Sequence, residues 1–264
     1  MSIATLPMYD WPEVRHDVDR LWRSLAEAFD DHELDPPSGL DRTRSLDDRW
    51  LDPDLLLGQT CGLPLVQRLG PEVAVLGTFD HGLPDTRPGD YHSVIVVPAD
   101  DDATSLADLV DAAVAVNGAD SQSGHGVWRH EFVTAGIDRS HLGPAIETGS
   151  HRGSIQAVAD GRARCAAVDA VSWALAVRHE PAAGRCRVAW RTDPTPALPL
   201  ITARTNRPLL DPMRAAIAAA VDALPATTAD ALLVYAFVPR LDDDYQVIAE
   251  RWNAAEATRV GRLA

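Results

Sequence analysis

Residues 120–124, with the sequence DSQSG, could hold an anion. They join an apolar run expected to be a strand to a helical pattern. Ser121 and Ser123 offer hydroxyl groups, and a helix beginning here would offer unpaired backbone N–H groups at the positive end of its dipole. Phosphate, phosphonate and carboxylate all suit such a site. Simple capping of the helix by Ser123, with no ligand, explains the same residues equally well.

Residues 148–161, with the sequence TGSHRGSIQAVADG, repeat this arrangement. Thr148 and Ser150 precede an expected helix, and His151 lies in its first turn. A helix amino terminus lowers the pKa of a histidine, whereas a bound anion raises it. His151 could therefore donate a hydrogen bond to an anion. A surface histidine at a helix start is an equally good interpretation.

Tyr91 and Asp169 also fall at the ends of expected strands. The Tyr91 phenol could donate to an anion or pack at a domain junction. The Asp169 carboxylate could accept a hydrogen bond from a protonated ligand oxygen or a ligand amine, and it would repel a fully ionised ligand. Asp169 could equally cap the helix that carries Trp173, and the two roles are compatible.

The elements that must position these residues alternate between apolar runs and helical patterns, which predicts an α/β fold with parallel sheets covered on both faces. Ligands bind beyond the carboxyl ends of the strands in such sheets, where these polar residues fall. Residues 35–45 are polar and rich in Pro and Gly, so a loop or a poorly formed edge is expected there. The expected strands are residues 3–6, 55–57, 73–76, 94–97, 113–116, 145–147, 165–168, 188–190 and 200–202, and the expected helices lie near 13–29, 105–110, 123–135, 151–161, 170–178, 211–224 and 243 onward.

Length and charge narrow the function classes. The 264 residues suffice for one large domain or two modest ones. The formal net charge of −15 argues against general nucleic-acid binding and against attraction to anionic membranes. No apolar run approaches the roughly 20 residues that span a bilayer. The start MSIATLPMYD lacks the pattern of a secretory signal, so we expect a cytoplasmic chain, or a periplasmic or extracellular one whose leader was removed.

Metal, cofactor and enzyme signatures are absent from the sequence. The three cysteines have no CxxC spacing, which predicts free thiols, and the acidic runs at 100–102 and 242–244 predict solvated turns or helix starts. No GxSxG, HExxH or GxGxxG motif is present. Nothing places a base beside a nucleophile. We therefore expect no cofactor, no metal and no catalysis.

Four segments in order resemble a known family: DLLLGQTCGLPLV, DYHSVIVVPADD, AVNGADSQSG and ETGSHRGSIQAVADGRARCAAVDAVSW. They are similar to the phosphate/phosphite/phosphonate substrate-binding components of ABC transporters, over roughly residues 55–202. The resemblance implies a type 2 periplasmic-binding-protein fold, in which two α/β lobes joined by two crossover strands hold the ligand in a cleft between them. Lobe one would comprise residues 1–92 and 195–264, and lobe two residues 93–194.

The resemblance also implies which residues bind the ligand. Residues 120–124, called the serine turn below, would bind the anion at the helix terminus. His151 and Tyr91 would add hydrogen-bond donors, and Asp169 would face a ligand amine or hydroxyl. Gln122 replaces one hydroxyl of the usual family loop. The implied set in lobe two is Ser121, Ser123, the Gly124 amide, His151 and Asp169. In lobe one it is Tyr9, Gln59, Thr60 and, next to the boundary, Tyr91.

Three functions follow from these observations. The first is a binding protein that closes by hinge motion on a small phosphorus oxyanion and serves ABC-type uptake, with transporter membrane subunits as partners and neither nucleic-acid binding nor direct membrane insertion. The second is a cytoplasmic enzyme, since other families with this architecture catalyse steps of cofactor biosynthesis. The third is a ligand sensor that acts with another protein.

Overall fold

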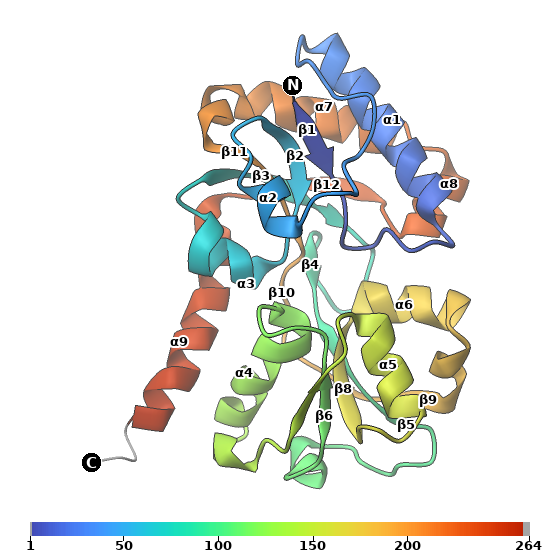
Figure 1. Cartoon of the computed structure of the whole chain (residues 1–264), viewed down its shortest axis with the longest axis vertical. Helices are drawn as coiled ribbons and strands as arrows, with labels where there is room; N and C mark the ends of the chain where they lie inside the picture. Colours follow the sequence, from blue (N-terminus) through green and yellow to red (C-terminus); the bar gives the residue numbers. More distant parts are fainter. Residues whose placement is uncertain (1, 261–264) are drawn as a thin grey trace. The chain divides into compact units, whose positions relative to one another are not determined.

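The computed structural model describes residues 2–260 and their side chains, except those of Arg139 and of residues 256–260. The chain divides into two compact units (Figure 1). Unit 1 comprises Met1–Asp90 and Pro196–Gln246, and unit 2 comprises Tyr91–Thr195 and the segment that begins at Val247. Each unit contains its own five-stranded sheet.

The sheet of unit 1 has the strand order β1-β2-β11-β3-β12. β1 is parallel to β2, whereas β11 runs antiparallel to β2 and β3, and β12 runs antiparallel to β3. Every residue of β2 and β11 is buried, as expected for central strands covered on both faces. The strands are β1 (Ile3–Thr5), β2 (Leu55–Gln59), β3 (Val73–Asp80), β11 (Pro199–Ala203) and β12 (Ala236–Pro239).

Two long helices, α1 (Arg15–Asp31) and α7 (Leu210–Asp222), pack against each other in unit 1. α1 buries Val18, Leu21 and Leu25, which recur at helical spacing, as the sequence predicts. The Ser24 hydroxyl donates to the Ala220 carbonyl at 3.0 Å. The other helical segments of the unit are α2 (Leu46–Trp50), α3 (Gly62–Pro64), α8 (Ala226–Leu232), the π turn Leu65–Leu69 and the 3₁₀ turns Arg204–Leu209 and Asp242–Tyr245.

The sheet of unit 2 has the order β7-β6-β8-β5-β9. β6 is parallel to β7 and β8, so these three strands present their carboxyl ends at one edge. β5 runs antiparallel to β8 and β9. The strands are β5 (Ser93–Pro98), β6 (Val114–Val116), β7 (Ala145–Glu147), β8 (Cys165–Asp169) and β9 (Cys186–Arg191).

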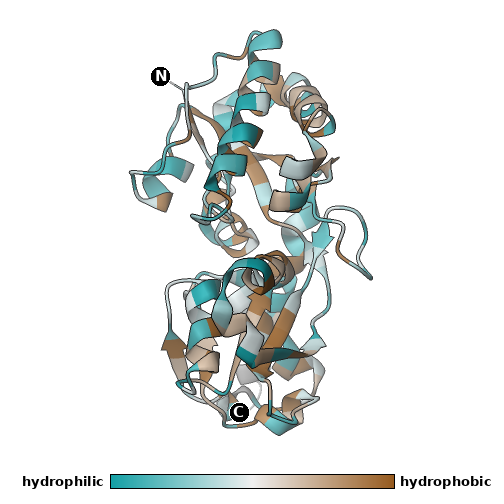
Figure 2. Ribbon diagram, turned by 90° about the vertical axis from the view of Figure 1, so that its right-hand side faces the viewer, coloured by the Kyte–Doolittle hydropathy of each residue, from teal (hydrophilic) through white to brown (hydrophobic). Residues whose placement is uncertain are grey.

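The helices of unit 2 cover an apolar core that includes Ile95, Val97, Trp128 and Phe132. In Figure 2 apolar segments recur in the strands, and the helices carry both polar and apolar residues. α5 ends where the sequence predicts, since Gly161 follows it with the positive φ of +72° that glycine tolerates best. The helices are α4 (Val127–Thr134), α5 (His151–Ala159), α6 (Ala170–His179) and α9 (Gln246–Val260), with a π turn at Gln122–Gly126 and 3₁₀ turns at Leu106–Leu109, Arg139–His141 and Pro181–Arg185.

The chain passes between units three times. The short strands β4 (Asp90–Tyr91) and β10 (Thr195–Pro196) pair with each other at the first two passages, and α9 makes the third. The sequence division places all of residues 195–264 in lobe one, whereas the segment from Val247 clusters with unit 2. The reason is local, because Arg251 donates to the carbonyls of Asp193 and Pro194 at 3.3 and 3.1 Å.

The expectation of parallel sheets is wrong, because both sheets are mixed. A parallel neighbour needs a crossover connection that returns the chain to the same end of the sheet. β5 and β11 instead follow β4 and β10 with no intervening helix, and both are antiparallel to their neighbours. The residues expected to be a helix at 105–110 form a 3₁₀ turn, and the helix expected from 123 begins as a π turn.

No single described helix is long and apolar enough to cross a membrane. One pair of helical segments would be long and apolar enough if its two parts were counted together, but they are bent by 106° to each other. The pair is Arg204–Asp222 and Ala226–Leu232.

Candidate functional site

The serine turn of unit 2 is built by Ser121, which caps the turn that continues into α4. The Gly124 amide donates to the Ser121 hydroxyl at 3.0 Å, and the His125 and Gly126 amides donate to the Ser121 carbonyl. Ser121, not Ser123, is therefore the capping residue. The Gly124 amide already has an acceptor in this conformation, and the Ser123 hydroxyl is left to contact a different residue.

That residue is His151, the first residue of α5. Its Nε2 atom lies 3.0 Å from the Ser123 hydroxyl and 3.2 Å from a carboxylate oxygen of Asp169. The side chains of His151 and Asp169 are only 12% and 4% exposed. The structure thus brings together three of the predicted site residues, which follow or end the adjacent strands β6, β7 and β8.

The structure confirms that Asp169 caps α6, whereas its contact with a ligand stays a prediction. One carboxylate oxygen accepts the Ser172 amide at 2.8 Å and caps α6, while the other faces His151. The cap fixes the orientation of the carboxylate, because α6 starts directly after β8. Asp169 is therefore a rigid acceptor beside the Ser123–His151 pair.

The Ser123, His151 and Asp169 side chains do not form a nucleophilic triad. A triad needs one imidazole nitrogen on the serine and the other held by the carboxylate. Here the serine hydroxyl and the carboxylate both approach Nε2. The geometry lacks the relay that would activate Ser123, and it suits hydrogen bonding to a ligand.

The predicted donor Tyr91 is 1% exposed, and its hydroxyl donates to the Gln122 side-chain oxygen at 3.2 Å. It therefore supports the serine turn from the strand side. Sequence reasoning missed two parts of this support. Ser93 donates to the Ser123 carbonyl at 2.8 Å, and Gln122 is a structural acceptor for Tyr91. The only sequence signal for Ser93 is its place as a polar residue opening an apolar strand.

Asn117 is a further residue that the sequence prediction omitted. Its side-chain oxygen is buried and has no hydrogen-bond partner among residues 2–260. A Cβ atom placed on Gly124 would lie 1.9 Å from that oxygen and 3.1 Å from His151 Cε1. Position 124 therefore admits only glycine while Asn117 and His151 keep these positions.

The predicted residues Tyr9, Gln59 and Thr60 lie in unit 1, whereas Tyr91, expected at the end of lobe one, is the first residue of unit 2. Tyr9 is buried and packs edge-on against His81, with ring centroids 5.5 Å apart. Gln59 ends β2, and the Thr60 amide donates to the Pro199 carbonyl at 3.0 Å. The Thr60 hydroxyl is buried without a partner in the described part of the chain. A role of these residues in ligand binding stays a prediction.

Burial lowers the pKa of His151, and the nearby Asp169 carboxylate opposes this only in part. The imidazole is therefore neutral in the folded protein at pH 7. No group of three or more His, Cys, Asp or Glu residues suited to a metal occurs among the described residues. The site offers a hydroxyl, a neutral imidazole and a fixed carboxylate.

The free energy of unfolding should decrease as the pH is lowered, and His151 should cause part of this decrease. Below its ordinary pKa of about 6.5, the unfolded chain binds a proton that folded His151 does not, so unfolding becomes easier. This loss should grow from about pH 6.5 downward until the lowered folded pKa is reached. We expect a steeper fall of the unfolding free energy for the wild type than for His151→Gln, measured by urea titration between pH 7 and 5. Parallel pH profiles would contradict a buried neutral His151.

Comparison with known proteins identifies the family. Residues 57–248 match the model of a family described as "ABC transporter, phosphonate, periplasmic substrate-binding protein". The chain belongs to this family. Substrate-binding proteins of this family bind a small ligand, work with the membrane subunits of an ABC transporter and are not enzymes.

Solved structures share the two-lobed fold of this substrate-binding protein. PhnD1 from Prochlorococcus marinus, in complex with methylphosphonate, has 17% identity and a TM-score of 0.74, over 95% of this chain and 96% of its own. PA3383 of Pseudomonas aeruginosa, a binding protein of an ABC phosphonate transporter, has 14% identity and a TM-score of 0.74, over 98% and 88%. The aliphatic sulphonate binding protein SsuA of Escherichia coli has 16% identity and a TM-score of 0.63, over 92% and 90%. No curated protein matches.

Proposed function

We propose that this substrate-binding protein takes a small phosphorus oxyanion, a phosphonate or phosphate, for ABC-type uptake. The observation that carries the proposal is the cluster of Ser123, His151 and Asp169 at the carboxyl ends of three adjacent strands. Ligands of α/β sheets bind at such edges. Ser123 and His151 would exchange their mutual hydrogen bond for bonds to ligand oxygens.

Asp169 supports phosphorus rather than sulfur as the central atom. A buried carboxylate repels an anion unless that anion still carries a proton to donate. A phosphonate or phosphate monoanion keeps such a P–OH group near neutral pH, whereas a sulfonate has none. Asp169 would accept that proton's hydrogen bond on the oxygen that now faces His151.

The remaining predicted residues take supporting roles in the proposal. Ser121 and the Gly124 amide shape the turn that presents Ser123, and Tyr91 holds that turn through Gln122. Tyr9, Gln59 and Thr60 of unit 1 are proposed to add contacts as the protein closes by hinge motion, since a ligand favours the conformation in which it makes more contacts.

The proposal predicts that methylphosphonate and phosphate raise the melting temperature, and that methanesulfonate and sulfate do so far less. Ser123→Ala and His151→Ala should each weaken methylphosphonate binding about tenfold or more, because each removes a hydrogen bond to a charged group. Thermal melts and calorimetric titration at constant ionic strength measure both effects.

Two variants sharpen the test. Asp169→Asn keeps an N-cap for α6 but removes the negative charge, so it should narrow the preference for phosphonate over sulfonate. Ser105→Ala, a serine elsewhere in unit 2, should leave ligand affinity unchanged. Equal stabilisation of the wild type by sulfonate and phosphonate, or no response to the whole panel, would overturn the proposal.

A further inference from the structure

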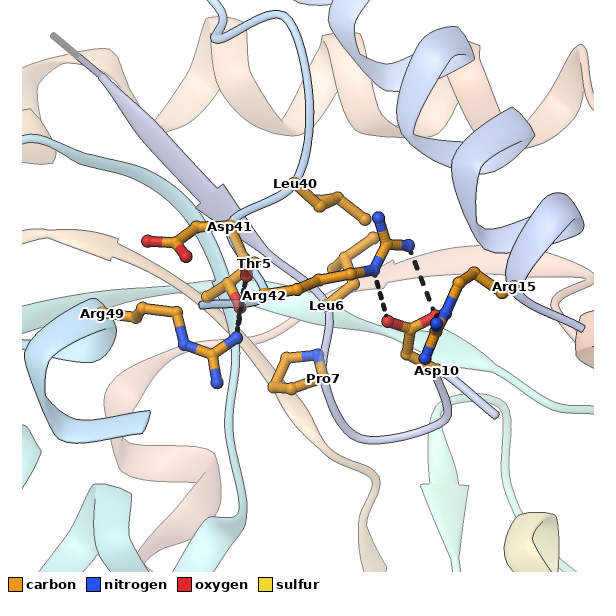
Figure 3. Close-up of a pocket in the computed structure, with 9 residues that line it drawn as sticks. All are labelled: Thr5, Leu6, Pro7, Asp10, Arg15, Leu40, Asp41, Arg42 and Arg49. Atoms are coloured by element: carbon orange, nitrogen blue, oxygen red, sulfur yellow. Dashed lines mark hydrogen bonds and ion pairs between the residues drawn. The ribbon is translucent and has the colours of Figure 1, made fainter. Parts of the chain in front are cut away.

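Unit 1 contains a pocket of about 180 Å³ that the sequence did not predict. Nine residues line it, from β1 and the loop after it, the start of α1, the segment around Asp41, and α2 (Figure 3). Three of these residues are arginines: Arg15, Arg42 and Arg49. None of the residues proposed to bind phosphonate lines the pocket.

Arg49 is buried and forms no ion pair with a carboxylate among the described residues. Only 8% of the residue is exposed. Its Nη1 atom donates to the Thr5 hydroxyl and the Asp41 carbonyl, both at 2.8 Å, and its Nε atom donates to the Ser45 carbonyl at 3.3 Å. All three acceptors are uncharged. Among the described residues, no carboxylate oxygen lies within 4 Å of the guanidinium, and Nη2 makes no hydrogen bond.

Asp41 also lines the pocket, but its carboxylate is paired with other residues. The Asp41 carboxylate accepts bonds from the Thr43 amide and hydroxyl and is paired with Arg44 at 2.5 Å. Figure 3 shows the Asp41 carboxylate turned away from the Arg49 guanidinium. Asp41 therefore contacts Arg49 only through its backbone carbonyl, and its carboxylate acts on the guanidinium through space without forming an ion pair.

The opposite wall of the pocket is already paired. Arg42 contacts Asp10 at 2.5 Å and Asp19 at 2.8 Å, and Arg15 lies 3.6 Å from Asp10. Figure 3 shows Arg42, Arg15 and Asp10 gathered on that side, with Arg49 reaching Thr5 on the other. The unmatched positive charge of the pocket thus belongs to Arg49.

We infer that this pocket binds a small oxyanion, a carboxylate or a phosphoryl group, through the Arg49 guanidinium, at a site lined by residues of unit 1 and by none of Ser123, His151 and Asp169. The two N–H groups of Nη2 are the donors left for such an anion, and hydrogen bonds between charged partners are the stronger ones. Burial lowers the pKa of Arg49, and the charges of Asp41 and Asp10 oppose this only in part, so an anion in the pocket would offset a remaining cost of holding that charge. Because Asp10 also lines the pocket, a singly charged oxyanion should bind better than a doubly charged one.

The test is a titration of the whole chain followed by NMR of the arginine side-chain N–H groups. The protein used is the double variant Ser123→Ala/His151→Gln. It lacks two side chains proposed to bind phosphonate, so this result is independent of the proposed function. Sodium acetate, inorganic phosphate and methyl phosphate are added in separate arms at an ionic strength held constant with sodium chloride. We expect a saturable shift of the Arg49 signal. Tighter binding of acetate would identify the ligand as a carboxylate, and tighter binding of phosphate or methyl phosphate would identify it as a phosphoryl group.

Arg49→Gln should abolish the saturable response, measured there by calorimetry. The control Arg68→Gln, which removes an exposed arginine of the same unit paired with Asp47, should retain it. If Arg49→Gln does not fold, Arg49→Lys keeps a positive charge. Its single nitrogen cannot bond the Thr5, Asp41 and Ser45 acceptors and reach the anion as well, so binding should weaken at least tenfold. A response that never saturates, or equal affinity in the Arg49 variants and the wild type, would overturn the inference.

Discussion

The Trp128→Ala variant is expected to lower the unfolding free energy of unit 2 by about 3–5 kcal/mol, as large-to-small changes of buried aromatics do. Trp128 is 1% exposed and lies in the core cluster between α4 and the strands β5, β6 and β8. It is the second residue of α4, which continues directly from the serine turn. Its loss should therefore leave a cavity and loosen the turn that presents Ser123.

Native-state hydrogen exchange of the β5 and β8 amides measures this effect within unit 2. The control is Trp128→Phe, which keeps most of the buried volume and removes an indole N–H that has no hydrogen-bond partner in the described part of the chain. Its cost should be about 1 kcal/mol or less, as for conservative core changes. A Trp128→Ala protein with wild-type exchange in these strands would show that the core does not hold α4.

Much of the fold could be predicted because buried strands and helix faces require apolar residues at a regular spacing in the sequence. The apolar runs at 55–57, 94–97 and 165–168 each fall inside an observed strand. The helical spacing after residue 13 predicts the buried face of α1. Such patterns report which residues face a core, and the structure follows them closely.

Strand direction could not be predicted in the same way. An apolar run is equally compatible with either direction, and the direction depends on how the chain re-enters the sheet. β11 enters unit 1 after β10 with no helix between them, and it is antiparallel to both neighbours. The π turn at Gln122–Gly126 was missed for a related reason, since its hydrogen-bond pattern has no distinctive residue spacing.

The residues of the candidate site that follow or end a strand could be predicted from the sequence. Ser123, His151 and Asp169 each follow or end an expected strand, and adjacent parallel strands bring such residues to one edge. Arg49 was not predictable, because its partners are the hydroxyl of the distant Thr5 and the backbone carbonyls of Asp41 and Ser45. Backbone acceptors leave no trace in residue types.

Gly124→Ala is expected to destabilise unit 2 by about 1–3 kcal/mol, the usual cost of inserting a methyl group into a packed site, and to abolish the proposed phosphonate response. The new Cβ would lie 1.9 Å from Asn117 Oδ1 and 3.1 Å from His151 Cε1. Either side chain must move, and a displaced His151 loses its contacts with Ser123 and Asp169. Thermal melts with and without methylphosphonate measure both effects.

Two comparisons show whether the clash, and not the loss of glycine itself, causes the damage. Gly184→Ala adds the same methyl group in unit 2 where no atom lies within 4 Å, so it should be close to neutral. Asn117→Ala removes the carboxamide that the new methyl group meets. In the double variant Gly124→Ala/Asn117→Ala the destabilisation should therefore be smaller than the sum of the two single effects, by about 1 kcal/mol or more. Strict additivity would mean that contact with Asn117 does not cause the damage, and that glycine is required at position 124 for another reason.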